Sequence, residues 1–183
     1  GDDTNLHNFQ NSRYIITVAG SDYVGDVSSF SSQGASILIA APGGGANNDS
    51  YLGEVLTTDR VGQAGYSPDD YRFISGTSFS APVVSGVVAL MLEANPTLGY
   101  RDVQTILAYS ARRTSFEGNT WEYNGAKDWN GGGLHYDAIT HNLGFGLVDA
   151  EAAVLLAESW GDSPLTSRNV SEVSATVSQR SNI

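Results

Sequence analysis

The sequence predicts an α/β domain built on a parallel β-sheet that is covered by helices. Residues 14–19 and 36–41 are two short runs with apolar residues on both faces, which is typical of strands in a parallel sheet between helices. A longer apolar run at residues 83–92 predicts a helix from about Ser78 to Ala94. Because apolar residues wrap most of its circumference, we expect this helix to be buried almost all round.

The next two elements are a hairpin and a second helix. Residues 54–58 and 71–75 are expected to form the two strands of the hairpin. Residues 59–70 would form its long tip, because glycine and proline interrupt that segment. A second helix is expected at residues 100–110, with Gly99 as its N-cap.

The C-terminal part of the chain is less regular. Residues 112–142 are rich in Gly, Asn and Trp and predict an irregular surface region. A short strand is expected at residues 144–148, followed by a helix at 150–159 that Asp149 caps. From residue 161 the composition shifts to Ser, Thr, Asn and Val, so residues 161–183 are interpreted as a linker or the start of another module.

Composition excludes several classes of function. The chain has 183 residues, enough for one domain with its own core. Its net charge is −11 and its pI about 4.4, so neither nucleic acid nor an anionic membrane surface is an expected partner. No apolar run approaches the length of a membrane span. The absence of cysteine excludes disulfides, zinc–thiolate sites and thiol catalysis.

The segment between the hairpin and the long helix is the candidate site. Ser78 is expected at a strand-to-helix corner, where its hydroxyl points outward and its N–H is among the unpaired donors of a helix N-terminus. Such donors favour negative charge, including the oxyanion formed in acyl transfer. The alternative is that Ser78 only caps the helix, as Ser and Thr commonly do. This segment alone leaves both interpretations open.

Several separated strings agree, in the same order, with one known family. They are Gly76-Thr77-Ser78-Phe79-Ser80-Ala81-Pro82, Gly86-Val87, residues 89–96, residues 101–104, residues 141–150, Asn11-Ser12-x-Tyr14-x-Ile16, Ala41-Pro42 and Thr57-Thr58-Asp59. On these strings the chain resembles the subtilisin-like serine proteases (peptidase family S8), and within them the kexin/furin-like branch.

The resemblance covers residues 1–160 and implies the C-terminal half of the catalytic domain. The family fold has three layers, with a mostly parallel sheet between helices. In kexin-like members a β-rich P domain follows the catalytic domain. Residues 161–183 would lead into such a module.

The family implies a serine endopeptidase that works through an acyl-enzyme. Its Ser-His-Asp triad has the nucleophile last in chain order, and the motif match implies that Ser78 is this nucleophile. The family's catalytic Asp and His, and the Asn that assists the oxyanion, would all lie upstream of Gly1. We therefore expect the chain alone to be inactive, with an N-terminal chain or segment as its partner. The start at Gly1, without an initiator Met, suggests a processed product or a fragment.

A base from this chain's own histidines is the alternative to an upstream segment. The chain has His7, His135 and His141. The resemblance gives His141 a structural role, and a histidine in an irregular region such as that of His135 is seldom a general base. A hydrogen bond from Ser78 to His135 or His141 would indicate a local base instead.

Calcium and substrate preference are implied by the resemblance alone. Family members bind structural Ca²⁺ at the floor of the primary pocket, and Asp2 matches one carboxylate ligand there. Ser32 occupies the second visible ligand position, although a hard cation prefers several anionic oxygens. Furin-like members favour basic residues before the scissile bond. His7 stands at one of the acidic positions used for that preference, so the chain departs from the furin pattern.

The leading expectation is a secreted or extracellular endopeptidase that acts on peptides or proteins, with the periplasm as the alternative location. One rival is a non-catalytic fragment or pseudoprotease that serves as a binding or structural subunit. An intact upstream His-Gly-Thr segment would favour the enzyme. The other rival, an α/β-hydrolase esterase, requires Gly-x-Ser-x-Gly, and position 80 is Ser80, which is not glycine.

Overall fold

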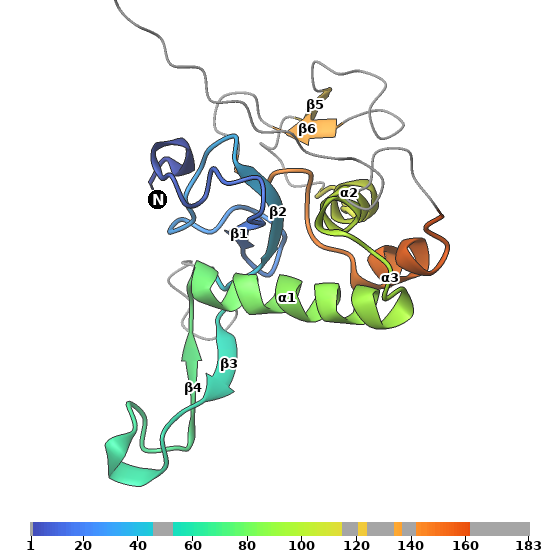
Figure 1. Ribbon diagram of the computed structural model, residues 1–183. Coiled ribbons are helices and arrows are strands. Elements are labelled where there is room, and N and C mark those ends of the chain that lie inside the picture. The colour runs from blue at the N-terminus through green and yellow to red at the C-terminus, as the bar shows by residue number, and fades with distance from the viewer. Residues whose placement is uncertain (1, 46–52, 115–120, 124–133, 137–141, 162–183) are drawn as a thin grey trace, which may run out of the picture.

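A pair of parallel strands lies at the centre of the fold. In the computed structural model, β1 (Thr17–Ser21) pairs with β2 (Ile37–Pro42), and helices lie beside this pair (Figure 1). The predicted α/β fold with a parallel sheet is thereby confirmed. The structure describes residues 2–45, 53–114, 121–123, 134–136 and 142–161.

Strand β1 is shifted by a few residues from its predicted position. The expected strand began at Tyr14, but that side chain is exposed and its ring lies 5.1 Å from the ring of Tyr100. At the other end, the strand continues through Gly20 and Ser21, because β2 offers both residues a partner. The apolar residues predicted which segment is buried, whereas pairing with β2 determines where the strand begins and ends.

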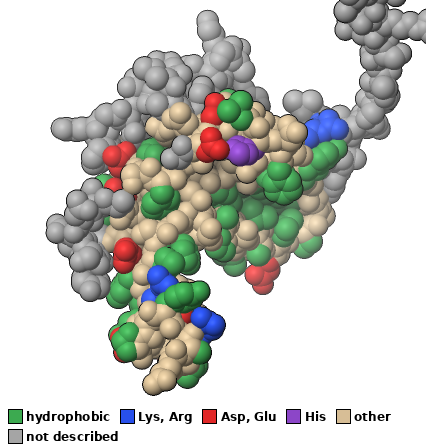
Figure 2. Space-filling model, turned by 90° about the vertical axis from the view of Figure 1, so that its left-hand side faces the viewer, with side chains coloured by type: hydrophobic (Ala, Val, Ile, Leu, Met, Phe, Trp, Pro, Cys, Tyr) green, Lys and Arg blue, Asp and Glu red, His purple; other side chains and the backbone are tan. Residues whose placement is uncertain are grey.

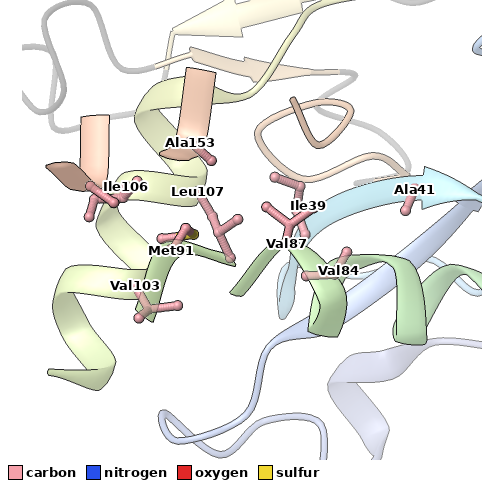
Figure 3. Packing of buried hydrophobic residues seen from close by; sticks show 10 residues of the cluster. Ile39, Ala41, Val84, Val87, Met91, Val103, Ile106, Leu107 and Ala153 are labelled. Carbon is pink, nitrogen blue, oxygen red and sulfur yellow. The ribbon is translucent and has the colours of Figure 1, made fainter. Parts of the chain in front are cut away.

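Each face of the strand pair has its own apolar cluster. Ile39 and Ala41 contact the cluster formed with the helices, and Figure 3 shows them beside Val84 and Val87. Ala40, which alternates with them along the strand, belongs to the cluster on the other face. Both faces of the pair are therefore buried, as the sequence predicted.

The second face is covered by the segment predicted as a strand at residues 144–148. Here only Leu147 makes isolated bridges, to Ala40 and to Arg112. Gly144 and Gly146 have φ angles of 61° and 132°, which interrupt an extended strand. The segment buries its leucine on the sheet without forming a regular strand, so the strand prediction was wrong.

Three helices were expected and three are described: α1 (Thr77–Ala94), α2 (Tyr100–Ser110) and α3 (Ala150–Glu158). Their ends agree with the predicted ends to within one residue. Helix α1 contacts β1 and β2, and α3 packs against both α1 and α2. Asp149 caps α3 as predicted, because its carboxylate accepts a hydrogen bond from the Ala152 N–H at 3.0 Å.

Helix α1 buries one face instead of its whole circumference. Its buried residues are Ser80, Val84, Val87 and Met91. Val83, Leu90 and Leu92 are 42%, 49% and 39% exposed in the described structure, so the prediction of burial all round was wrong. An apolar helix face tends to be buried, but the sequence does not show which other segment or protein covers it.

The sequence-based exclusion of a membrane-length apolar segment was also wrong for α1. Over Thr77–Ala94 its mean hydropathy of 1.4 suffices for a membrane span by length and composition. The same is true of many core helices. Since α1 packs against β1, β2 and α3, we interpret it as the central helix of the domain.

The remaining helices at the N-terminus and in the hairpin are short. They are the 3-10 turns η1 (Thr4–Leu6) and η2 (Gly62–Ala64). Within the region predicted to be irregular, β5 (Trp121–Tyr123) pairs antiparallel with β6 (Leu134–Tyr136). Nearly all of the predicted linker at 161–183 lies outside the described residues.

Two polar side chains, Asp102 and Asn95, together link the ends of the three helices. Asp102, 3% exposed, accepts hydrogen bonds from the Gly99 N–H at 2.7 Å and from the Trp160 indole at 3.0 Å. The Asn95 amide, just after α1, donates to the backbone carbonyls of Ala157 and Trp160 at 3.0 and 3.3 Å. A buried carboxylate needs such donors, and here they fix the helices relative to one another.

The predicted hairpin is present and projects from the body as an arm (Figure 1). Strands β3 (Val55–Thr58) and β4 (Tyr71–Ile74) pair antiparallel. The arm carries Lys or Arg side chains close to apolar ones (Figure 2), and Arg60 and Arg72 each lie over the Tyr66 ring, 5.3 and 5.0 Å from its centroid.

Asp59 organises the tip of this arm. Its carboxylate accepts backbone hydrogen bonds from Tyr66 at 2.6 Å, Ser67 at 2.8 Å and Arg60 at 2.8 Å. Desolvation raises the pKa of Asp59, but these three hydrogen bonds outweigh it and hold the pKa below the ordinary value of 3.8. The ionised carboxylate therefore stabilises the tip.

We predict that acid releases the tip of the arm. A lowered pKa means that this stabilisation is complete above pH 3.8 and is lost as the pH falls through the lower pKa of the folded state. NMR amide shifts of Tyr66 and Ser67 should move together with a midpoint below 3.8. Asp59→Asn should abolish this transition, and the exposed Asp69→Asn should preserve it. A midpoint at or above 3.8, or an unchanged transition in Asp59→Asn, would contradict the assignment.

Candidate active site

Ser78 lies in the first turn of α1, and it is not the helix cap. The helix begins at Thr77, and the N-cap is Gly76, which makes no side-chain capping bond. Ser78 is exposed, and its hydroxyl has no hydrogen-bond partner among the described residues. The capping interpretation of Ser78 was therefore wrong, and its hydroxyl is open to solvent.

The backbone around Ser78 leaves a donor unused. The Phe79 N–H donates to the Gly76 carbonyl at 3.0 Å, whereas the Ser78 N–H donates to no other described residue. The first N–H groups of a helix lack acceptors within the helix and favour negative charge. An exposed hydroxyl and a free N–H thus occur on the same residue.

A pocket of about 330 Å³ opens beside Ser78. Neither acidic nor basic side chains line it among the described residues. Its lining consists of Thr4, Phe9, Gln10, Ile15, Ile16, Thr17, Val18, Ser32, Ile37, Thr77, Ser78 and Ala81. The part of the pocket that the described residues form is therefore uncharged.

Asp2, His7 and Ser32 are brought together by the fold. The Asp2 carboxylate lies 2.9 Å from the His7 Nε2 atom, and the Asp2 N–H donates to the Ser32 hydroxyl at 3.2 Å. The hydrogen bond with His7 is the main cause of the lowered pKa of Asp2, and the Asp3 N–H adds to it. Ser32 also lines the pocket beside Ser78, so this group adjoins the candidate site.

These three residues fit a calcium ion poorly. Ca²⁺ takes six to eight oxygen ligands, usually with several carboxylates, and here Asp2 is the only carboxylate of the three. One of its oxygen atoms already pairs with His7. The described residues contain no group of three or more His, Cys, Asp or Glu side chains that could hold a metal. The role of Asp2 in calcium binding stays a prediction from the resemblance.

Within the described residues, no base is found at Ser78. The His7 ring bonds to Asp2, and no interaction joins it to Ser78. His141 and the side chain of His135 lie outside the described parts, so the alternative of a local base stays a prediction.

Sequence reasoning missed the contact beneath Ser78. The Gly76 N–H donates to the carbonyl of Gly43 at 2.8 Å, which joins the end of β2 to the start of α1. Gly43 follows the strand predicted at residues 36–41, and the sequence assigned no role to it. The neighbouring Ala41-Pro42 string, which matched the family pattern, was the available signal.

Comparisons with known proteins agree with this geometry. The family model of the subtilase family, Peptidase_S8, matches residues 1–146. A PC3-like endoprotease variant of Hydra vulgaris is 32% identical over 163 residues, which are 89% of this chain and 21% of the relative. Proprotein convertase subtilisin/kexin type 6 of Rattus norvegicus is 36% identical over 160 residues, 87% of this chain and 15% of the relative. Human furin is 30% identical over 159 residues, 87% of this chain and 18% of furin.

Solved structures give the same result. A protease of Pseudoalteromonas arctica superposes with a TM-score of 0.60 at 29% identity, covering 82% of this chain and 38% of that one. The serine protease of Aeromonas sobria gives 0.60 at 27% identity, covering 80% and 30%. The chain spans 15% to 21% of the length of the three curated relatives above. Within that span, the predicted likeness to kexin/furin-like subtilases is confirmed, and the chain belongs to the subtilase family of serine endopeptidases.

Proposed function

We propose that this chain is the nucleophile-bearing, C-terminal part of a subtilase catalytic domain, with Ser78 as the nucleophile. The observation that carries the proposal is the exposed Ser78 hydroxyl, free of partners among the described residues and open to a pocket. The substrate would be a peptide or protein, as expected for this family of endopeptidases.

The chemistry assigned to Ser78 is acyl transfer. Its Oγ would attack the scissile carbonyl carbon while its proton passes to a base, and the carbonyl oxygen would become an oxyanion. The free Ser78 N–H would donate one hydrogen bond to that oxyanion. Collapse of this intermediate would release the amine and leave an acyl-enzyme, which water then hydrolyses.

The base must come from outside the described part of this chain. We propose that an upstream segment, or a separate N-terminal chain, supplies the catalytic His and Asp and the oxyanion-binding Asn. The short span of this chain relative to its relatives supports this idea. We refer to the combination of both parts as the complete protease.

Uncovered apolar surface next to the site supports the same proposal. The pocket formed by Ile16, Val18, Ala81, Val84, Ser85 and Val88 measures about 250 Å³. Among the described strands, β1 pairs only with β2. On the other edge of β1, Ser21 bridges to Val27 and the Gly20 carbonyl accepts from the Ser28 N–H, so among the described residues only the start of that edge is open to a further strand. A segment that continues the sheet and covers α1 would bury this surface.

The remaining parts of the proposal rest on family resemblance. They are a secreted, extracellular or periplasmic location and a structural Ca²⁺ in the complete protease. No catalytic step depends on this Ca²⁺. The residues 161–183 would connect to a P-domain-like module. The alternative is a pseudoprotease, which is favoured by the lack of a described base at Ser78.

We predict that Ser78→Ala abolishes peptide hydrolysis by the complete protease. Loss of the nucleophile should lower kcat by about four orders of magnitude or more, with peptide affinity nearly unchanged. Steady-state kinetics and peptide binding would be measured on both proteins. Ser159→Ala is the matched control, because among the described residues the Ser159 hydroxyl donates only to carbonyls of its own helix, at 3.1 and 3.3 Å.

Retained hydrolysis in Ser78→Ala would disprove the assignment of the nucleophile. A complete protease that folds but neither hydrolyses peptides nor reacts with a fluorophosphonate probe would instead support the pseudoprotease.

A second prediction concerns substrate preference. Because the pocket lining is uncharged, we expect this chain to give little selection for Arg or Lys before the scissile bond. Ser32→Glu places a carboxylate at the pocket and should raise the share of Arg and Lys in a peptide-library profile by about fivefold, roughly 1 kcal/mol. Ser32→Gln, of similar size but uncharged, should leave the profile unchanged. Equal shifts in both variants would show that charge is not the cause.

A further inference from the structure

The first turn of α1 rests on the backbone of two glycines at the ends of the parallel strands. The Gly43 N–H donates to the Ser21 carbonyl at 2.9 Å, and the Gly43 carbonyl accepts from the Gly76 N–H at 2.8 Å. Gly43 therefore bridges β1 to the residue two positions before Ser78. Gly20, the second glycine, lies under the same turn and faces Thr77 and Ser80.

There is no room for a side chain on Gly43. A Cβ atom at this position would overlap the Ser80 hydroxyl and would lie 3.0 Å from the Gly76 carbonyl oxygen. Ser80 is fully buried, so it cannot swing into solvent to make space. The backbone conformation at position 43 does not itself require glycine, because Gly43 is not one of the described glycines with a positive φ angle.

Ser80 adds no hydrogen bond to this contact. Its Oγ atom is buried and has no hydrogen-bond partner in the described structure. A buried hydroxyl without a partner forms no stabilising hydrogen bond and has lost its hydrogen bonds to water. The hydroxyl therefore acts in this contact through its volume, which closes the space above Gly43.

We propose that Gly43 is a positioning residue for Ser78. Because Gly43 has no side chain, the first turn of α1 lies directly on the end of β2. The distance between this turn and the strand end sets where the Ser78 hydroxyl and N–H point. A Cβ atom would push the turn outward through Ser80 and Gly76, displacing the nucleophile without touching the substrate. The inference rests on the proposed role of Ser78.

The test uses kinetics of the complete protease. Gly43→Ala should lower kcat by about 10- to 100-fold, as expected for a misplaced reacting group, and leave KM within about twofold. Ser80→Ala removes the atom that the new Cβ would overlap, so Gly43→Ala/Ser80→Ala should regain at least about threefold in kcat over the single variant. The single and double variants should label with fluorophosphonate in the same order as their kcat values.

Gly161→Ala is the matched control, because a Cβ atom there meets no atom of the described residues within 4 Å. It should keep the parental kcat. Parental kcat in a folded Gly43→Ala protein, or equal kcat in the single and double variants, would overturn the positioning role. If Gly43→Ala does not fold, Gly20→Ala carries the test, since its Cβ would lie 3.2 Å from Phe30 and 3.3 Å from Thr77. A parental kcat in a folded Gly20→Ala protein would then overturn the claim that the close seating of this turn on the strand ends positions Ser78.

The outcome also separates this inference from the proposed function. Hydrolysis that survives Ser78→Ala refutes the proposed nucleophile. Hydrolysis that is lost in Ser78→Ala but is unaffected by Gly43→Ala refutes only the positioning role.

Discussion

The hydrogen bond from the Gly76 N–H to the Gly43 carbonyl, 2.8 Å long, is the contact on which the candidate site depends. It fixes the start of α1, which carries the proposed nucleophile Ser78, on the end of the parallel strands. The far end of the helix is held as well, because Asn95 and Trp160 link it to α2 and α3. A helix anchored at both ends can hold a reactive side chain in one place, which is the requirement for positional catalysis.

Much of the fold could be predicted from local pattern. The periodicity of the apolar residues gave all three helices to within a residue of their ends, and Asp149 was correctly identified as a cap. The buried runs predicted a parallel pair, and the turn residues predicted the β3–β4 hairpin. The helices and the hairpin depend on residues close in the sequence, so the sequence expresses them directly. The parallel pair could be predicted because each of its strands carries apolar residues on both faces. The motif at residues 76–82 indicated the family, and the role proposed for Ser78 follows from that family.

Features that depend on contacts distant in sequence could not be predicted. The exposed side of α1 was missed because apolar side chains do not reveal whether their partner belongs to the same chain. The segment at residues 144–148 looked like a strand, but positive φ at Gly144 and Gly146 interrupts it. The role of Gly43 was missed for a related reason: a glycine required for space at a distant contact looks, in sequence, like a glycine that ends a strand.

The central claim, that Ser78 is a nucleophile activated by residues outside the described chain, is tested most directly by intact-mass analysis after fluorophosphonate treatment. This chain alone and the complete protease would be treated side by side, and the modified peptide would be sequenced. The account predicts one adduct, at Ser78, in the complete protease and none in the chain alone. Equal labelling of the isolated chain, or an adduct at another serine in the complete protease, would contradict it.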